Sequence, residues 1–195
     1  MGDRAKPFLK WAGGKTRLAR LLASMAPPFT GRYFEPFMGS AALFFELAPE
    51  RAVLSDANED LVVCFQEVAR DPYTVMDLLD RMPNTREAYM AVRRQDPTKL
   101  SGPERAARVI YLNKTGFRGL WRVNRRGEFN VPYGEYSRPY YNRENLLRAS
   151  KALAVADIRV ADFEEVMGQA VAGDFIYLDP PYVPDRKWGD FRRYT

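Results

Sequence analysis

Residues 32–68 have the sequence RYFEPFMGSAALFFELAPERAVLSDANEDLVVCFQEV, and this stretch decides the fold. Its apolar spacing predicts, in order, a strand at 32–35, a helix at 41–47, a strand at 51–56 and a helix at 58–68 with Asn58 as a plausible cap. Alternation of strand and helix is typical of a parallel sheet with helices packed on it. We therefore expect an α/β fold with a doubly wound, mostly parallel sheet.

The flanking sequence extends this pattern and then interrupts it. Residues 17–25 predict a helix that ends at Pro27-Pro28, and strands are expected at 158–160 and 174–178. Between 71 and 150 helical patterns dominate, followed by a turn at 125–128 that predicts a hairpin. We expect a catalytic domain made of residues 1–70 and 151–195, with an insertion at 71–150.

Positive charge is concentrated in one part of this insertion. The chain has a net charge of +5, whereas residues 101–150 carry ten Lys and Arg against four Glu. An excess of that kind is typical of a surface that faces phosphates. The segment is therefore the candidate nucleic-acid-binding surface.

The absence of histidine limits the chemistry that the chain can perform. With no His and a single Cys, Cys64, it has neither a Ser-His or Cys-His nucleophile nor a His- or thiolate-ligated metal cluster. Cys64 lies in an apolar run and is expected to be a buried filler. Catalysis must then use carboxylates, lysine, tyrosine, backbone groups or a reactive cofactor, and no metal is predicted.

The tetrapeptide Asp179-Pro180-Pro181-Tyr182 follows the strand expected at 174–178. Two prolines stiffen it and remove two backbone donors, which leaves the Asp179 carboxylate and neighbouring carbonyls as acceptors. Acceptors beside the Tyr182 ring suit a planar ligand with an exocyclic amine, such as a nucleobase. A proline-rich turn that only ends the strand is the alternative, and the tetrapeptide alone favours neither.

Two glycine-containing segments are candidate ligand loops. Lys10 to Thr16 reads KWAGGKT and ends like a phosphate-binding P-loop, but Leu9 stands where that motif requires glycine and no strand precedes it. For these two reasons we reject the interpretation of this chain as a nucleoside triphosphatase. A glycine turn whose flanking Trp11 and Lys15 contact a ligand remains, with a plain turn before a helix as the alternative.

The second segment is residues 34–40, which include the end of the first predicted strand and the turn after it. Asp56 ends the second predicted strand. A glycine turn there lets a cofactor lie across the strand ends, with Asp56 placed to bond ribose hydroxyls. Only Gly39 of a dinucleotide fingerprint is present, and the acidic Glu35 disfavours a pyrophosphate. A ribonucleoside with a cationic tail, S-adenosylmethionine, fits better than NAD or FAD.

Residues 113–136 interleave arginines with aromatic residues and glycines. Arginine can pair bidentately with guanine in the major groove, while aromatic and leucine side chains fill gaps between base steps. Taken in isolation, this segment favours the alternative of a solvated basic hairpin. Beside an adenosine-type pocket it is the less economical interpretation.

Five motifs in this order together resemble the alpha group of the bacterial DNA adenine-N6 methyltransferases. They are Lys10 to Lys15, Phe34 to Gly39, Asp56, Asn113 to Tyr136, and Asp179 to Tyr182. The resemblance runs from Phe8 to the last residue. The stretch GEFNVP at 127–132 is similar to that of members that methylate adenine in GATC.

The resemblance implies a role for each matching residue. For S-adenosylmethionine it implies contacts with Trp11, Lys15, Phe37, Gly39, Asp56, Asp162, Phe163 and Asp179. For catalysis it implies Asp179, Pro180, Pro181 and Tyr182. For double-stranded DNA it implies recognition contacts by Lys10, Leu120, Arg122 and Tyr136, and a phosphate contact by Arg118.

The resemblance also carries expectations about the whole protein. Family members continue with further strands and a helix where this chain ends, so we expect a C-terminally incomplete catalytic domain. A catalytically incomplete DNA-binding fragment, or a methyltransferase of RNA or of a protein glutamine amide, are the alternatives. We expect a monomer without a membrane partner, in the cytoplasm and associated with a bacterial or phage nucleoid.

Overall fold

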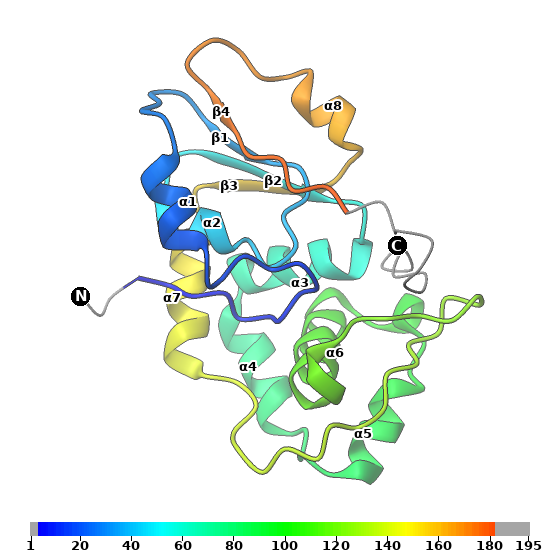
Figure 1. Cartoon of the computed structure of the whole chain (residues 1–195). Coiled ribbons are helices and arrows are strands. Elements are labelled where there is room, and N and C mark those ends of the chain that lie inside the picture. The colour runs from blue at the N-terminus through cyan, green and yellow to red at the C-terminus, as the bar shows by residue number, and fades with distance from the viewer. Residues whose placement is uncertain (1–3, 182–195) are drawn as a thin grey trace.

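The computed structural model describes residues 4–181, and its centre is a four-stranded sheet. The strands are β1 (Tyr33–Glu35), β2 (Ala52–Asp56), β3 (Ala156–Val160) and β4 (Phe175–Ile176). They are all parallel and lie in the order β3-β2-β1-β4 (Figure 1). The predicted α/β fold with a parallel sheet is confirmed. β4 is shorter than the strand expected at 174–178.

Both faces of the sheet are covered by helices. On one face lie α1 (Ala19–Met25), α2 (Ala42–Leu47) and α3 (Glu59–Arg70), and on the other lies α8 (Phe163–Met167) (Figure 1). Tyr33 and Phe34 are both fully buried, but Tyr33 joins the large core under α2 and α3 while Phe34 packs with Val166 of α8. Successive strand residues point to opposite faces, so a strand buried on both has a continuous apolar run.

Local sequence signals set the helix boundaries. The Asn58 side chain accepts a hydrogen bond from the Leu61 N–H at 3.0 Å and begins α3, as predicted. α1 ends at Met25, just before Pro27-Pro28. α1 ends before β1, and α3 begins after β2, so these two helices flank the part of the chain that contains β1, α2 and β2.

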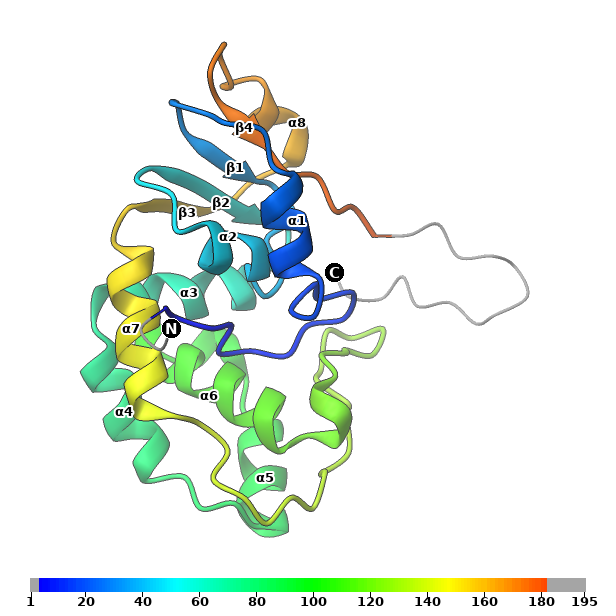
Figure 2. The same cartoon turned by 60° about the vertical axis from the view of Figure 1, so that its left-hand side comes forward.

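The segment between α3 and β3 is mostly helical. It contains α4 (Pro72–Asp80), α5 (Arg86–Arg93), α6 (Gly102–Thr115) and α7 (Arg143–Leu153), with short 3-10 helices η1 (Pro97–Lys99) and η2 (Phe117–Gly119). Residues 120–131 form an arm whose two sides meet at a bridge between Val123 and Phe129. The Gly127 N–H donates to the Asn124 carbonyl at 3.0 Å and closes the expected turn (Figure 2).

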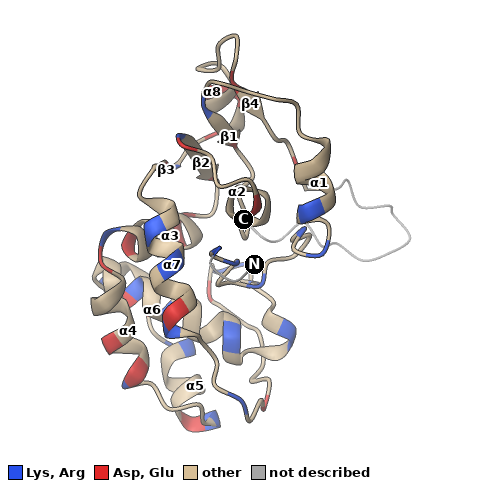
Figure 3. Cartoon of the chain, turned by 90° about the vertical axis from the view of Figure 1, so that its left-hand side faces the viewer, with Lys and Arg blue, Asp and Glu red and all other residues tan. Residues whose placement is uncertain are grey.

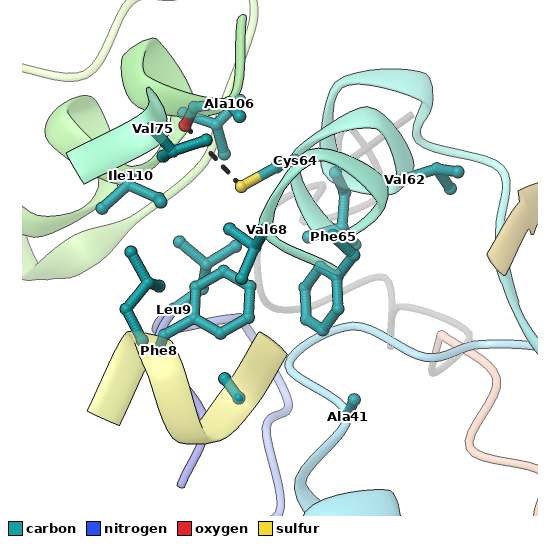
Figure 4. Close-up of a cluster of buried hydrophobic side chains, with 14 of the residues drawn as sticks. Phe8, Leu9, Ala41, Val62, Cys64, Phe65, Val68, Val75, Ala106 and Ile110 are labelled. Atoms are coloured by element: carbon teal, nitrogen blue, oxygen red, sulfur yellow. Dashed lines mark hydrogen bonds between the residues drawn. The ribbon is translucent and has the colours of Figure 1, made fainter. Parts of the chain in front are cut away.

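The two halves of the chain share one hydrophobic core. In Figure 4, Cys64 of α3 points its thiol at the Ala106 carbonyl of α6, with an Sγ–O distance of 3.7 Å, and Phe8 and Val68 lie nearby. Burial raises the pKa of this thiol well above its ordinary value, as expected of an inert filler. α7 continues across residue 150, from the helical segment toward β3. The helical segment and the sheet are thus connected by the chain, and they also pack on each other in this core.

The N-terminal segment, residues 4–15, runs between the sheet and the helical half (Figure 1). Two asparagines hold it by the same pair of bonds. The Asn113 amide accepts from the Lys10 N–H at 2.9 Å and donates to the Lys10 carbonyl at 2.6 Å, and it also donates to the Gly119 carbonyl at 3.0 Å. The Asn145 amide bonds the Lys6 N–H and carbonyl, both at 2.9 Å.

The Asn113 and Asn145 side chains differ in burial, and this difference yields a prediction about stability. Asn113 is fully buried, so Asn113→Ala leaves backbone groups without water or partner and should lower the free energy of unfolding by about 2–4 kcal/mol. Asn145→Ala is the matched control, because its bonds are exposed and water can replace them; it should cost less than about 1 kcal/mol. Urea unfolding measures both. Equal losses would contradict this account of the two asparagines.

Candidate active site

The strand order places the candidate site. β1 lies between β2 and β4: the chain passes from β1 to β2 and on to β3 in one direction, and then crosses back through α8 to β4 on the other side of β1. In an open α/β sheet the crevice outside the carboxyl ends of such a pair is where ligands bind. Glu35 and Phe37 lie at the end of β1, Asp56 ends β2, and Asp179 follows β4.

Asp179 is paired with a lysine from the opposite end of the chain. The Lys15 ammonium forms an ion pair with the Asp179 carboxylate and also donates to the Gly13 carbonyl at 2.9 Å. Both side chains are only about one-fifth exposed, at 18% and 23%. The structure therefore brings together the loop at 10–16 and the Asp-Pro-Pro segment, two segments that the resemblance assigns to the same cofactor. Pro180 and Pro181 are described and exposed, whereas Tyr182 lies outside the described residues.

Gly39 lies between Asp56 and Trp11. Its N–H donates to the Asp56 carboxylate at 3.1 Å, and its φ of +46° is one that glycine adopts without strain. A Cβ at this position would lie 3.0 Å from Trp11 Cδ1. Burial raises the pKa of Asp56, although the N–H groups of Asn58 and Gly39 oppose the rise.

Two aromatic rings from different elements pack against each other near the carboxyl ends of the strands. Phe37 after β1 and Phe163 of α8 have ring centroids 5.3 Å apart, with planes inclined by 31°. The Asp162 side chain begins α8 by accepting from the Glu164 N–H at 2.8 Å. Asp162 and Phe163, predicted on the cofactor side, thus lie beside Phe37.

Glu35 is a buried acid at the same crevice. Burial raises its pKa to about 8, and Asp179 and Asp56 add to the rise, while the Tyr33 hydroxyl donates to it at 2.8 Å and opposes it. Within residues 4–181 no three Asp, Glu, His or Cys lie close enough together to hold a metal ion. Three acids around one crevice fit a ligand with cationic groups and ribose hydroxyls better than one with a pyrophosphate.

The residues predicted to contact DNA fall into two groups, both near the N-terminal segment. The Arg118 N–H donates to the Tyr136 hydroxyl at 2.8 Å, and the Lys10 ammonium lies 5.3 Å from the centre of the Tyr136 ring. Arg118 is exposed, with a φ of +57°. Lys10, Arg118 and Tyr136 are therefore neighbours although up to 126 residues separate them in the chain.

Leu120 and Arg122 lie on the arm instead. The Arg122 guanidinium is exposed, and its Nε donates to the Asn130 side chain across the arm at 2.7 Å. Leu120 is half-buried and follows η2. Arg122 Nη2 also donates to the Asn130 carbonyl at 3.5 Å, so a side-on bidentate contact through Nε and Nη2 would replace these bonds.

A basic cavity adjoins the first group. Its volume is about 550 Å³, and its cationic lining residues are Lys6, Lys10, Lys114, Arg138 and Arg148. Figure 3 shows Lys and Arg positions along the N-terminal segment and on α7. Burial lowers the pKa of Lys114 to about 8, and the positive charges of Lys10 and Arg138 lower it further. Such a cavity favours an anion.

Some residues of the site escaped the sequence reasoning. Asn113 and Lys114 were part of a basic run without assigned roles, and Glu35 served only to disfavour a pyrophosphate. One sequence feature does point to Asn113: its amide directly follows the apolar run Val109 to Leu112 of α6. A polar side chain buried beside such a run needs hydrogen-bond partners. Which partners it finds could not be read from spacing.

The parallel sheet and its crevice define the fold of S-adenosylmethionine-dependent methyltransferases. A family model described as D12 class N6 adenine-specific DNA methyltransferase matches residues 11–195. The chain is 39% identical to a type II methyltransferase of Lactococcus lactis subsp. cremoris, covering 97% of this chain and 70% of the relative. It is 35% identical to a DNA adenine methylase of Haemophilus influenzae, covering 97% and 68%. The chain belongs to the D12 class of N6 adenine-specific DNA methyltransferases.

Relatives also include a viral protein. The chain is 33% identical to a DNA N-6-adenine-methyltransferase of Escherichia phage P1, covering 97% of this chain and 26% of the relative. Among residues 4–181, no helix is both long and apolar enough to span a membrane.

The raised pKa of Glu35 predicts a pH dependence of stability. Between pH 4.5 and about 8 the folded protein holds a proton that the unfolded chain has released, so the free energy of unfolding falls as the pH rises through this window. Glu35→Gln cannot ionise and should lose this decline. Relative to wild type, it should gain on the order of a few kcal/mol between pH 5 and pH 9. Urea unfolding of the ligand-free proteins measures this, and identical pH slopes would refute it.

Proposed function

We propose that the protein transfers a methyl group from S-adenosylmethionine to the N6 amine of adenine in double-stranded DNA, in the sequence GATC. The observation that carries the proposal is the position of Asp179. It follows β4 at the crevice beside β1, paired with Lys15 of the loop at 10–16. The acceptors of the Asp-Pro-Pro segment therefore face the same crevice as the residues proposed to hold the cofactor.

The cofactor side consists of residues that suit a cationic nucleoside. Asp56 bonds the ribose hydroxyls, Phe37 and Phe163 enclose the adenine with Asp162, and Gly39 lets the backbone approach it. Trp11, Lys15 and Asp179 hold the methionine end. S-adenosylmethionine supplies a methyl group on a cationic sulfur, which is an electrophile that a neutral amine can attack.

The target side depends on Asp179 and Pro180. An adenine flipped out of the duplex stacks on Tyr182, which lies outside the described residues, and its N6 amine donates to the Asp179 carboxylate and the Pro180 carbonyl. Those bonds aim the nitrogen lone pair and remove it from conjugation with the ring. The ion pair with Lys15 positions the Asp179 carboxylate. Positioning and electrostatics supply most of the rate, and no metal is involved.

The DNA side is the insertion at 71–150, together with the N-terminal segment. Lys10, Leu120, Arg122 and Tyr136 contact the recognition sequence. Arg118 and the cations of the basic cavity contact phosphates. The choice of GATC rests on the similarity of the GEFNVP stretch at 127–132 to that of members that methylate adenine in GATC. We propose that the protein works as a monomer on the nucleoid of a bacterium or phage.

Transfer of tritium from labelled cofactor to DNA, RNA and protein in parallel tests the reaction. We expect label only in adenine of duplex DNA. Asp179→Ala should lower the rate by about 10²- to 10³-fold or more while DNA binding persists, because the acceptor for the N6 amine and a contact to the cofactor are lost but the DNA-contacting residues remain. Asp157→Ala, at an exposed acid of β3, is the control and should keep full activity. Near-normal turnover by Asp179→Ala would exclude this role. Tight DNA binding by wild type without labelled product would support a binding module instead.

A second prediction separates base recognition from phosphate contact. Arg122→Ala should lose about 1–3 kcal/mol of discrimination at one base pair, since a bidentate contact with guanine is removed. Arg118→Ala should weaken binding to all sequences and reduce the dependence on salt. Binding to GATC and its single-base variants across a salt series measures both. If Arg122→Ala weakens every site equally, the arm does not recognise the sequence.

A further inference from the structure

The DNA side and the cofactor side touch through a line of packed aromatic rings. Trp121 of the arm is only 4% exposed, and its ring stacks on Trp11 with centroids 6.1 Å apart and planes inclined by 25°. On its other side Phe129, from the opposite side of the arm, lies 4.8 Å away. Trp11 in turn lies against Gly39, where a Cβ would come within 3.0 Å of its ring.

This line ends at a carboxylate of the crevice. The Gly39 N–H donates to Asp56 at 3.1 Å, so a displacement of Trp11 acts on the residue that orients this acid. Close-packed interiors transmit such displacements because they hold no free volume to absorb them. The contacts from Phe129 to Asp56 are therefore continuous.

The backbone is tied at the same place. Asn113 bonds Lys10, next to Trp11, and Gly119, two residues before Trp121. A Cβ at Gly119 would lie 2.5 Å from Lys10 Cδ, which shows how closely the two segments approach. Trp11 and Trp121 consequently share one support, and the arm cannot shift without changing the stack between them.

The arm has a reason to shift when DNA binds. Arg122 directly follows Trp121, and a side-on bidentate contact with guanine through Nε and Nη2 would replace the two bonds that it makes to Asn130. Exchanging those bonds removes a tie between the two sides of the arm that also present Trp121 and Phe129. Recognition of the base would thus change the packing of Trp121 on Trp11.

We propose that Trp121 is a positioning residue that couples sequence recognition to cofactor binding through Trp11 and Gly39. The inference rests on the function proposed above. Coupling between two sites is reciprocal, so the cognate duplex should tighten cofactor binding by the same factor by which the cofactor tightens DNA binding. Trp121 touches neither ligand in this proposal and acts through Trp11.

The test measures this factor with S-adenosylhomocysteine as the cofactor probe. Calorimetry gives its affinity with and without a GATC duplex, for wild type, Trp121→Leu and Trp121→Phe. Leucine keeps an apolar side chain in the buried position, and phenylalanine restores an aromatic face. The thermal midpoint of each variant shows whether it is folded. If Trp121→Leu does not fold, the coupling factor of Trp121→Phe is compared with that of wild type instead.

For wild type we expect the duplex to tighten probe binding by about fivefold or more. Trp121→Leu should bring this factor to within about twofold of one while the affinity for each ligand alone changes little, and Trp121→Phe should restore most of it. A wild-type factor of one, an unchanged factor in Trp121→Leu, or no rescue by Trp121→Phe would overturn the proposal. Wild type that binds neither probe nor DNA would instead refute the proposed function, and this inference with it.

Discussion

The pairing of β4 with β1 is the constraint on which the rest of the site depends. Only two residues of β4 form the strand, and the Phe175 and Tyr177 N–H groups donate to Arg32 and Phe34 at 2.9 and 2.8 Å. This short contact delivers Asp179 to the end of a strand that belongs to the other end of the chain. Because β1 is buried on both faces by Tyr33 and Phe34, its position is among the most strongly determined in the molecule. A two-residue strand can therefore position the Asp-Pro-Pro segment.

The N-terminal segment adds the second long-range contact, and it serves both sides of the site. Its backbone is fixed by Asn113 and Asn145, and its side chains divide between two neighbourhoods. Lys15 turns to Asp179, whereas Lys10 turns to the Tyr136 ring. One segment of extended chain thus supplies groups to the crevice and to the DNA-facing surface, which is why the two lie side by side.

Charge is arranged in opposite ways on these two sides. The crevice collects acids, and the burial of Glu35 together with the proximity of Asp56 and Asp179 raises its pKa to about 8. The basic cavity collects cations, and the same two causes, burial and like charge, lower the pKa of Lys114 to about 8. On each side a ligand of opposite charge would therefore favour the charged form of the buried group, Glu35 or Lys114. The family supplies the matching pair, DNA and, as proposed, a sulfonium cofactor.

The sequence by itself determined the order of strands and helices and the parallel sheet, because apolar periodicity and capping signals such as Asn58 act over a few residues. Its motifs, by their resemblance, indicated the family. The sequence also placed Asp56 correctly at the end of β2, whereas Asp179 lies three residues beyond the end of β4. The tertiary structure alone decided which distant groups meet: Lys15 with Asp179, Asn113 with Lys10, and Trp121 with Trp11. Such contacts follow from how buried surfaces fit together across more than a hundred residues of chain, and local spacing carries no record of that fit.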